Sequence, residues 1–174
     1  MVFTSVVVLT LATPAGFGKI FYSKNEAMQL AFGKDAEVEM LSLFLTDEQI
    51  NEIQHLAHGK MESALFTFYV GRRNGQILGY AAIESHTVRT KPETLLILLS
   101  RGGELEKIEV LAFHEPPEYQ PTASWFTQFY RRTLDQMDFN SGVQGISGAT
   151  LSAQSALTSV RKVKAIFQLV VKGD

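Results

Sequence analysis

Hydroxyl residues stand in a run of small residues close to the C-terminus. The run covers 145–152 and reads Gly-Ile-Ser-Gly-Ala-Thr-Leu-Ser. It leads into a long amphipathic segment, and the first backbone N–H groups of a helix that starts there have no partner within the helix. These groups and the helix dipole attract an anion. The run therefore indicates either a phosphate site or an ordinary helix cap, because Ser and Thr are also common N-cap residues.

The tetrapeptide Ser147-Gly148-Ala149-Thr150 resembles the S/T-G-A-T signature of the FMN-binding domain family. That family occurs in the flavin-carrying subunits of sodium-pumping quinone reductases and Rnf-type complexes. The resemblance implies that a separate flavin transferase esterifies the Thr150 hydroxyl to the phosphate of FMN. It also implies that the residues next to Thr150 in the sequence bind the phosphate, namely Ser147, Gly148, Ala149, Leu151 and Ser152.

Three further segments resemble landmarks of small FMN-binding proteins, in the same order along the chain. They are His86–Arg89, Phe113–Tyr119 and Trp125–Phe129. The resemblance implies that His86 and Arg89 lie at the flavin, just past a strand. Arg89 suits the phosphate or the charge of reduced flavin, because a guanidinium offers paired donors to an anion. The alternative for Arg89 is a surface arginine at a strand end.

Glu115 and Pro116 belong to a loop that stands where larger relatives in the family carry a Glu-Thr-Pro-Gly loop beside the flavin. The pair Pro116-Pro117 predicts a rigid loop. The resemblance implies that this loop lies against the isoalloxazine ring through its backbone and Glu115. Tyr119 and Trp125 either stack on that ring or pack in the core.

One position departs from the family's pattern. Gln144 stands three residues before Ser147, where the transferase recognition pattern has an acidic residue. Glutamine keeps hydrogen-bonding capacity but loses the charge. Non-covalent flavin binding therefore stays open beside covalent attachment.

Composition excludes several classes of function. The chain has 174 residues, a net charge of −2 and no cysteine. The charge balance argues against a nucleic-acid partner, and the lack of cysteine excludes disulfides, thiolate metal sites and iron–sulfur clusters. His55 and His58 could share a helix face, but no further ligand set accompanies them, so no metal site is predicted. Redox chemistry would then need an organic cofactor.

The N-terminal residues 1–20 form an apolar leader without a charge from Val2 to Gly18. This stretch is typical of a secretory signal or a marginal membrane anchor, although a basic residue before it is missing. Pro14 interrupts it, and it is short of the roughly 20 residues of a simple membrane-spanning helix. We expect a single FMN-binding domain over 21–174, located in the periplasm or at the extracytoplasmic face of the membrane.

The elements that must position these residues follow from periodicity and turn signals. Ser23 and Thr46 are expected to cap two helices, closed by Gly33 and Gly59. Four strands in two hairpins are expected over 65–70, 76–84, 94–99 and 105–113, with Asn74-Gly75 as one turn. Helices after Thr122 and Thr150 complete the chain. The predicted fold class is α+β, with helices packed on a mainly antiparallel sheet and an FMN-binding-domain-like arrangement.

Hydrolase chemistry is not supported, although 145–149 comes within one residue of a G-x-S-x-G nucleophile elbow. That fold places an acid and then a histidine after the serine, and beyond Ser147 the chain has no histidine and only Asp174 as an acid. A dinucleotide fingerprint is also missing, because Gly16-Phe17-Gly18 lacks the third glycine. No catalytic side chain is predicted.

The sequence thus predicts an FMN-binding electron-transfer flavoprotein, with the flavin on Thr150 and redox proteins, or a membrane electron-transfer complex, as partners. The flavin would do the chemistry while the protein sets its position. Two alternatives stay open. One is a flavin-dependent reductase of a small molecule or quinone, and the other is an accessory protein without flavin.

Overall fold

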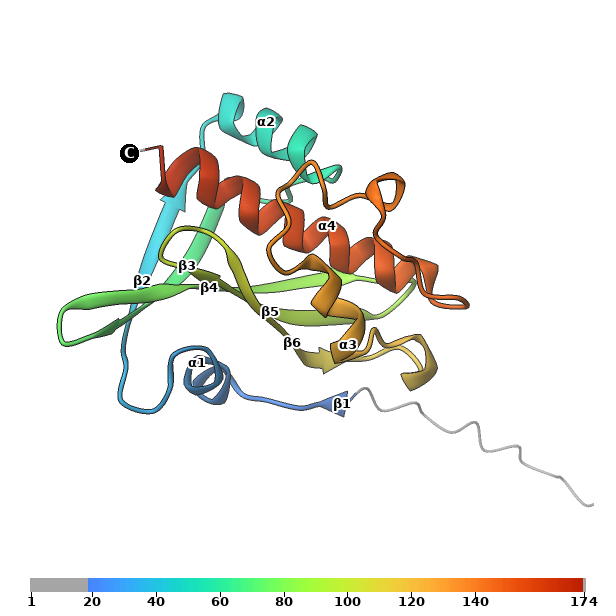
Figure 1. The fold of residues 1–174 in the computed structure, drawn as a ribbon, viewed down its shortest axis with the longest axis horizontal. Helices are drawn as coiled ribbons and strands as arrows, with labels where there is room; N and C mark the ends of the chain where they lie inside the picture. The colour runs from blue at the N-terminus through green and yellow to red at the C-terminus, as the bar shows by residue number, and fades with distance from the viewer. Residues whose placement is uncertain (1–18, 174) are drawn as a thin grey trace, which may run out of the picture.

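The computed structural model describes residues 19–173, which form an α+β fold (Figure 1). A six-stranded antiparallel sheet has the strand order β1-β6-β5-β4-β3-β2. The strands are β1 (Lys19–Ile20), β2 (Glu37–Phe44), β3 (Leu65–Arg73), β4 (Gln76–Thr87), β5 (Pro92–Ser100) and β6 (Leu105–Phe113). The helices are α1 (Lys24–Phe32), α2 (Asp47–Ala57), α3 (Ala123–Phe126) and α4 (Thr150–Ile166). The predicted α+β class and antiparallel sheet are confirmed.

The two predicted hairpins form the centre of the sheet. β3 and β4 join at Asn74-Gly75, where φ is 51° and 76°. Both residues of a type I′ turn need positive φ, which is why Asn-Gly is a strong hairpin signal. β5 and β6 join at a turn in which Gly103 has a φ of 86°.

Two strands were not predicted. β2 lies at one edge of the sheet with most of its residues exposed, so it lacks the clear alternation of a strand with one buried face. β1 has two residues, Lys19 and Ile20, which pair with Phe113 and Ala112 of β6. The described residues begin at Lys19, and the leader boundary at residue 20 stays a prediction. The leader itself, residues 1–18, lies outside the described residues.

Local capping explains where the first two helices start. Ser23 and Glu26 form a capping box at α1, and Thr46 and Gln49 form another at α2. α1 ends at Gly33 as expected. α2 ends earlier than the expected Gly59, because His58 adopts a left-handed conformation with φ of 52°. Between residues 19 and 173, no helix is both long enough and apolar enough to cross a membrane.

Helices cover both faces of the sheet. α2 and α4 lie on one face and α1 on the other (Figure 1). The larger core cluster packs α4 residues such as Val160 and Val163 against Phe68, Leu95 and Ile97 of the strands. The smaller cluster packs Ala27, Met28 and Phe32 of α1 against the opposite face. Because α4 packs on the sheet along most of its length, its first residue, Thr150, has a defined position relative to the strands.

Arg161 of α4 fastens the segments on either side of the helix. Its guanidinium is buried and donates to the carbonyls of Leu56, Leu134 and Met137. Leu56 lies near the end of α2, and the other two lie in the segment that leads to α4. The burial of this charged side chain is matched by its hydrogen bonds to the three backbone carbonyls.

Candidate functional site

A tight turn precedes α4 at the predicted signature. The backbone N–H of Ala149 donates to the carbonyl of Ile146 at 3.0 Å. Gly148 occupies the third position of this turn with a φ of 79°, a value that glycine adopts without strain. Ala149 is the N-cap residue of α4 and makes no side-chain cap. Thr150 is the first helical residue, and its side chain is exposed. Thr150 is therefore not the N-cap residue, which was the alternative to a phosphate site.

The start of α4 offers backbone donors. The first bond of the helix runs from the N–H of Ala153 to the carbonyl of Ala149. The N–H groups of Thr150, Leu151 and Ser152 precede it and have no acceptor within the helix. Together with the helix dipole they favour an anion at this point.

Arg89 and Tyr119 share a solvent-open hollow with the start of α4. The hollow has a volume of about 280 Å³ and is lined by Arg89, Tyr119, Gly148, Ala149, Thr150, Leu151 and Ser152. The guanidinium carbon of Arg89 lies 5.1 Å from the centre of the Tyr119 ring, which is cation–π distance. One positive side chain, one exposed hydroxyl and a helix start thus face a common space. This is a donor set that fits a phosphate ester.

Glu115 holds the loop that carries Arg89. Its Oε1 accepts hydrogen bonds from the backbone N–H groups of Arg89, Thr90 and Lys91, at 3.2, 2.7 and 2.9 Å. The hydrogen bond from Thr90, with those from the other two N–H groups, lowers the pKa of the Glu115 carboxyl. Glu115 is buried, and this oxygen is directed to the loop backbone.

Pro116 and Pro117 set the path to Tyr119. Pro117–Tyr119 is a 3-10 turn with Pro116 at its N-cap, and the N–H of Tyr119 donates to the carbonyl of Pro116 at 3.0 Å. Proline fixes φ at a value compatible with such a turn. The proline loop therefore contains a 3-10 turn, and Tyr119 at the end of this turn lines the hollow.

Trp125 lies at a different hollow from Thr150. Its indole N–H donates to the carbonyl of Gln144 at 2.7 Å, and its ring packs edge-on against Phe126 and Phe129. Gln128 accepts from the backbone N–H of Gln144 at 2.7 Å. Trp125 thus fixes the approach to the signature, and stacking of a flavin ring on it stays a prediction.

His86 lies within β4 and not just past a strand, and it belongs to a buried chain of hydrogen bonds. Its Nε2 is 3.0 Å from Oε2 of Glu93, the residue of β5 that pairs with it in the sheet. Its Nδ1 is 2.9 Å from the Oγ of Ser159 on α4. His86 does not line the hollow that contains Thr150. Contact between His86 and the flavin stays a prediction.

A second charged pair joins the same faces of β4 and α4. Glu84 forms an ion pair with Lys162. Burial raises the pKa of the Glu84 carboxyl, and the nearby Lys162 ammonium opposes that rise. Glu84 and His86 stand two residues apart, on one face of β4. Paired polar side chains therefore line this part of the contact between α4 and the sheet.

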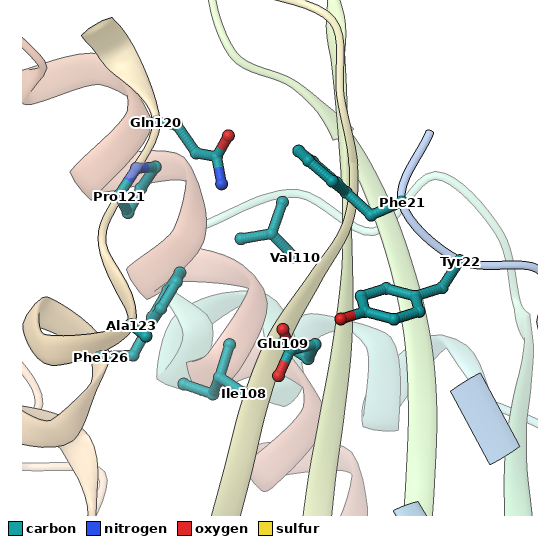
Figure 2. Close-up of a pocket in the computed structure, with 9 residues that line it drawn as sticks. All are labelled: Phe21, Tyr22, Ile108, Glu109, Val110, Gln120, Pro121, Ala123 and Phe126. Carbon is teal, nitrogen blue, oxygen red and sulfur yellow. The ribbon is translucent and has the colours of Figure 1, made fainter. Parts of the chain in front are cut away.

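The pocket beside β6 does not offer a comparable anion site. A pocket of about 170 Å³ lies between β6, the segment after β1 and α3 (Figure 2). Among its described lining residues Glu109 alone is charged, which disfavours a phosphate. Within residues 19–173, no group of three or more His, Asp or Glu side chains could hold a metal ion.

The structure thus sorts the predicted site residues. Gly148, Ala149, Leu151 and Ser152 share one hollow with two others, Arg89 and Thr150. Ser147 is exposed in the turn before them, and Pro116 stands at the base of the Tyr119 turn. Glu93 and Ser159 were not among the predicted site residues. Their pairing through His86 depends on strand register and helix rotation, for which no local motif exists.

The comparisons add no relative. No family model matches the chain, and no similar curated protein or solved structure was found. The resemblance to the FMN-binding domain family therefore rests on the residues quoted above.

Proposed function

We propose that this chain is an electron-transfer flavoprotein that holds FMN at the start of α4, by a phosphoester to Thr150. The observation that supports this most is the hollow itself. It combines the exposed Thr150 residue, three free N–H groups of a helix start and the Arg89 side chain. Three residues that line the hollow, Gly148, Ala149 and Thr150, belong to the tetrapeptide that resembles the S/T-G-A-T signature.

The residues present fit a phosphate group. Arg89 balances the negative charge and offers paired donors. The N–H groups of Leu151 and Ser152 donate to phosphate oxygens along the helix axis. Thr150 supplies the hydroxyl oxygen for the ester bond. Ser147 is the second residue of the turn from Ile146 to Ala149, and it is not among the residues that line the hollow.

FMN, when bound, supplies the redox chemistry, because a flavin accepts two electrons and can release them singly. The chain binds and orients it. The hollow of about 280 Å³ is near the lower end of small-molecule pockets, roughly 300 Å³. Such a site holds the phosphate end of a ligand and leaves the rest accessible. That favours exchange of electrons with a partner protein over a reductase with an enclosed substrate cavity.

Partners and location form part of the same proposal. A flavin transferase would move the FMN phosphoryl group from a flavin dinucleotide to the Thr150 oxygen. This step breaks the pyrophosphate bond and releases the nucleoside monophosphate and the hydroxyl proton. Redox proteins, or a membrane electron-transfer complex, would deliver and take electrons. The apolar segment at residues 1–18 supports export to the periplasm or the outer face of the membrane. A covalent cofactor suits a compartment without flavin supply, because it cannot diffuse away.

The test is the intact mass of the full chain co-expressed with a flavin transferase, measured after denaturation together with a flavin absorbance scan. We expect an added mass of about one FMN that survives denaturation. Thr150→Val removes the hydroxyl and keeps a branched side chain of similar shape, so the added mass should vanish. Ser147→Ala is the matched control, because it removes an exposed hydroxyl three residues earlier and should keep the flavin.

The outcomes separate the alternatives. Flavin that leaves on denaturation means non-covalent binding, with Gln144 as the candidate reason. Loss of the flavin in Ser147→Ala but not in Thr150→Val would move the ester to Ser147. A purified chain without any flavin would overturn the redox proposal in favour of an accessory protein.

A further inference from the structure

β2 is an edge strand whose outer side has no partner strand among the described residues. It pairs with β3 from Glu37 to Phe44 without a register shift. Every second residue of an edge strand turns its N–H and C=O groups outward. Natural edge strands are usually protected by proline, lysine or a bulge. The half from Met40 to Phe44 carries no charge, no proline and no bulge.

The same strand bears an exposed apolar stripe. Val38, Met40 and Phe44 are 39%, 66% and 81% exposed, and Leu65, the β3 partner of Phe44, is 48% exposed. These β2 residues share the sheet face that α1 covers elsewhere, since Met40 pairs with Tyr69, which packs in the α1 cluster. α1 covers the β2 end of this face only in part: the Nζ of Lys24 lies 4.0 Å from the Sδ of Met40, and Met40 and Phe44 stay largely exposed. An exposed stripe beside an open edge is typical of an interaction surface.

We propose that two copies of this chain associate through β2, edge to edge and antiparallel, so that the two sheets become continuous. The symmetry of such a pair suits the strand. A two-fold axis normal to the sheet maps each face onto itself, so the even-numbered residues of one copy stand beside the even-numbered residues of the other. Val38, Met40 and Phe44 would then continue into the same stripe of the second copy.

Charge restricts the register. An axis at Val38 or Glu39 would place Glu39 opposite Glu37 or Glu39 of the other copy. Like charges directly opposite each other are unfavourable. An axis at Met40 or Leu41 instead places Glu39 opposite Leu41 or Leu43 and keeps nearly the whole strand paired. The self-complementary registers are therefore those centred on Met40 and Leu41.

The pairing would leave the hollow at α4 open. The first turn of α4 and β2 lie towards opposite sides of the molecule in Figure 1. Each copy would thus keep an accessible site at an outer end of the joined sheets. The proposal does not depend on flavin and stands or falls separately from it.

The first test is the solution mass of the full chain over a range of concentrations, by light scattering after size exclusion. We expect a species of twice 19.3 kDa. Met40→Lys places two ammonium groups directly opposite each other with the axis at Met40, or diagonally close with the axis at Leu41, and should remove that species. Ile20→Lys is the matched control, because Ile20 is an apolar residue of β1, 70% exposed at the other edge. It should leave the two-chain species unchanged.

Single-cysteine variants locate the axis, since the chain has no cysteine of its own. Residues at the axis face their own copy at about 4.5–5.5 Å between Cα atoms, within reach of a disulfide. We expect either Met40→Cys or Leu41→Cys to cross-link on mild oxidation. Val38→Cys should stay uncross-linked, because two such residues would be offset by roughly 13 Å with the axis at Met40, and further with the axis at Leu41.

Three results would overturn the proposal. One is a single-chain mass at every concentration. Another is a two-chain species that persists in Met40→Lys, which would assign the association to a different surface. The third is cross-linking at Val38→Cys without cross-linking at Met40→Cys and Leu41→Cys. Circular dichroism of each variant checks that the fold is kept.

Discussion

The carboxylate of Glu115 accepts a hydrogen bond from the backbone N–H of Arg89, with 3.2 Å between Oε1 and the nitrogen. Arg89 follows β4 and Glu115 follows β6, so the contact joins two segments that are distant in sequence. The same oxygen also receives the N–H groups of Thr90 and Lys91. Glu115 therefore acts on the candidate site through the loop that presents Arg89.

Glu115→Gln should reduce the dependence of stability on acid. The hydrogen bonds that lower the pKa of Glu115 below 4.5 in the folded chain stabilise it above pH 4.5, and this contribution is lost as the pH falls through the folded value. The variant keeps an acceptor but not the charge, so we expect it to lose about 1 kcal/mol near neutral pH. It should lose less than the unsubstituted chain on acidification, in urea unfolding from neutral pH to about pH 3.

Glu118→Gln is the control for this prediction. Glu118 is an exposed carboxylate three residues further along, so its substitution should leave the acid profile unchanged. Identical acid profiles for the unsubstituted chain and Glu115→Gln would contradict the role of Glu115.

Arg89→Gln should weaken binding of the phosphate end of FMN. The guanidinium lines the hollow with Thr150, and hydrogen bonds to charged groups contribute about 1.5–3 kcal/mol, or roughly tenfold to a hundredfold in affinity. Arg89→Lys keeps the charge but not the paired donors, so its FMN affinity should lie between that of the unsubstituted chain and that of Arg89→Gln. Quenching of FMN fluorescence in the Thr150→Val background measures the affinity without the ester bond.

The control for Arg89 is Arg101→Gln, which removes an exposed arginine in the turn between β5 and β6. It should leave FMN affinity unchanged. Equal affinity in Arg89→Gln and the unsubstituted chain would remove Arg89 from the phosphate site.

Gly148→Ala should strain the turn before Thr150. The φ of 79° costs an L-residue about 1–2 kcal/mol, while an added Cβ would meet no atom within 4 Å. We therefore expect a stability loss of about 1 kcal/mol and less flavin attachment, measured by urea unfolding and intact mass. Gly145→Ala is matched, because Gly145 also has open space but no positive φ. Equal stability of the two variants would show that the turn relaxes freely.

Local signals in the sequence predicted the parts of the fold that local chemistry decides. The capping box at Ser23 and the Asn74-Gly75 turn each depend on a few neighbouring residues, so composition and spacing suffice. The turn of small residues before Thr150 is also decided by a few neighbouring residues. Its exposed hydroxyl and free helix start could be predicted before the structure was known.

Long-range pairing could not be predicted in this way. β2 has no buried face of its own, so its residues lack the period of a half-buried strand. The burial of Arg161 could not be predicted either, because its partners are carbonyls far away in the sequence. The partners of His86 depend on the register of β4 with β5 and on the rotation of α4.

His86→Ala should destabilise the fold and leave flavin attachment to the folded chain unchanged. Glu93 is fully buried and His86 pairs with it, so the substitution leaves a buried carboxylate and the Ser159 hydroxyl without their partner. We expect a loss of about 1–3 kcal/mol in the free energy of unfolding, which is the cost of leaving a buried polar group without its hydrogen-bond partner. Ser159→Ala removes one hydrogen bond and should cost about 1 kcal/mol.

A double-mutant cycle of His86→Ala with Ser159→Ala separates this coupling from simple loss of packing, because residues in one hydrogen-bond chain give non-additive energies. His55→Ala provides the control, since His55 is exposed on α2 and should be neutral. Additive energies would mean that the bond between Ser159 and His86 adds nothing to the hold of α4 on the sheet. Loss of FMN affinity in folded His86→Ala, with Arg89 and Thr150 intact, would instead support the flavin contact that the family resemblance implies and would require His86 to reach the ligand from outside the hollow.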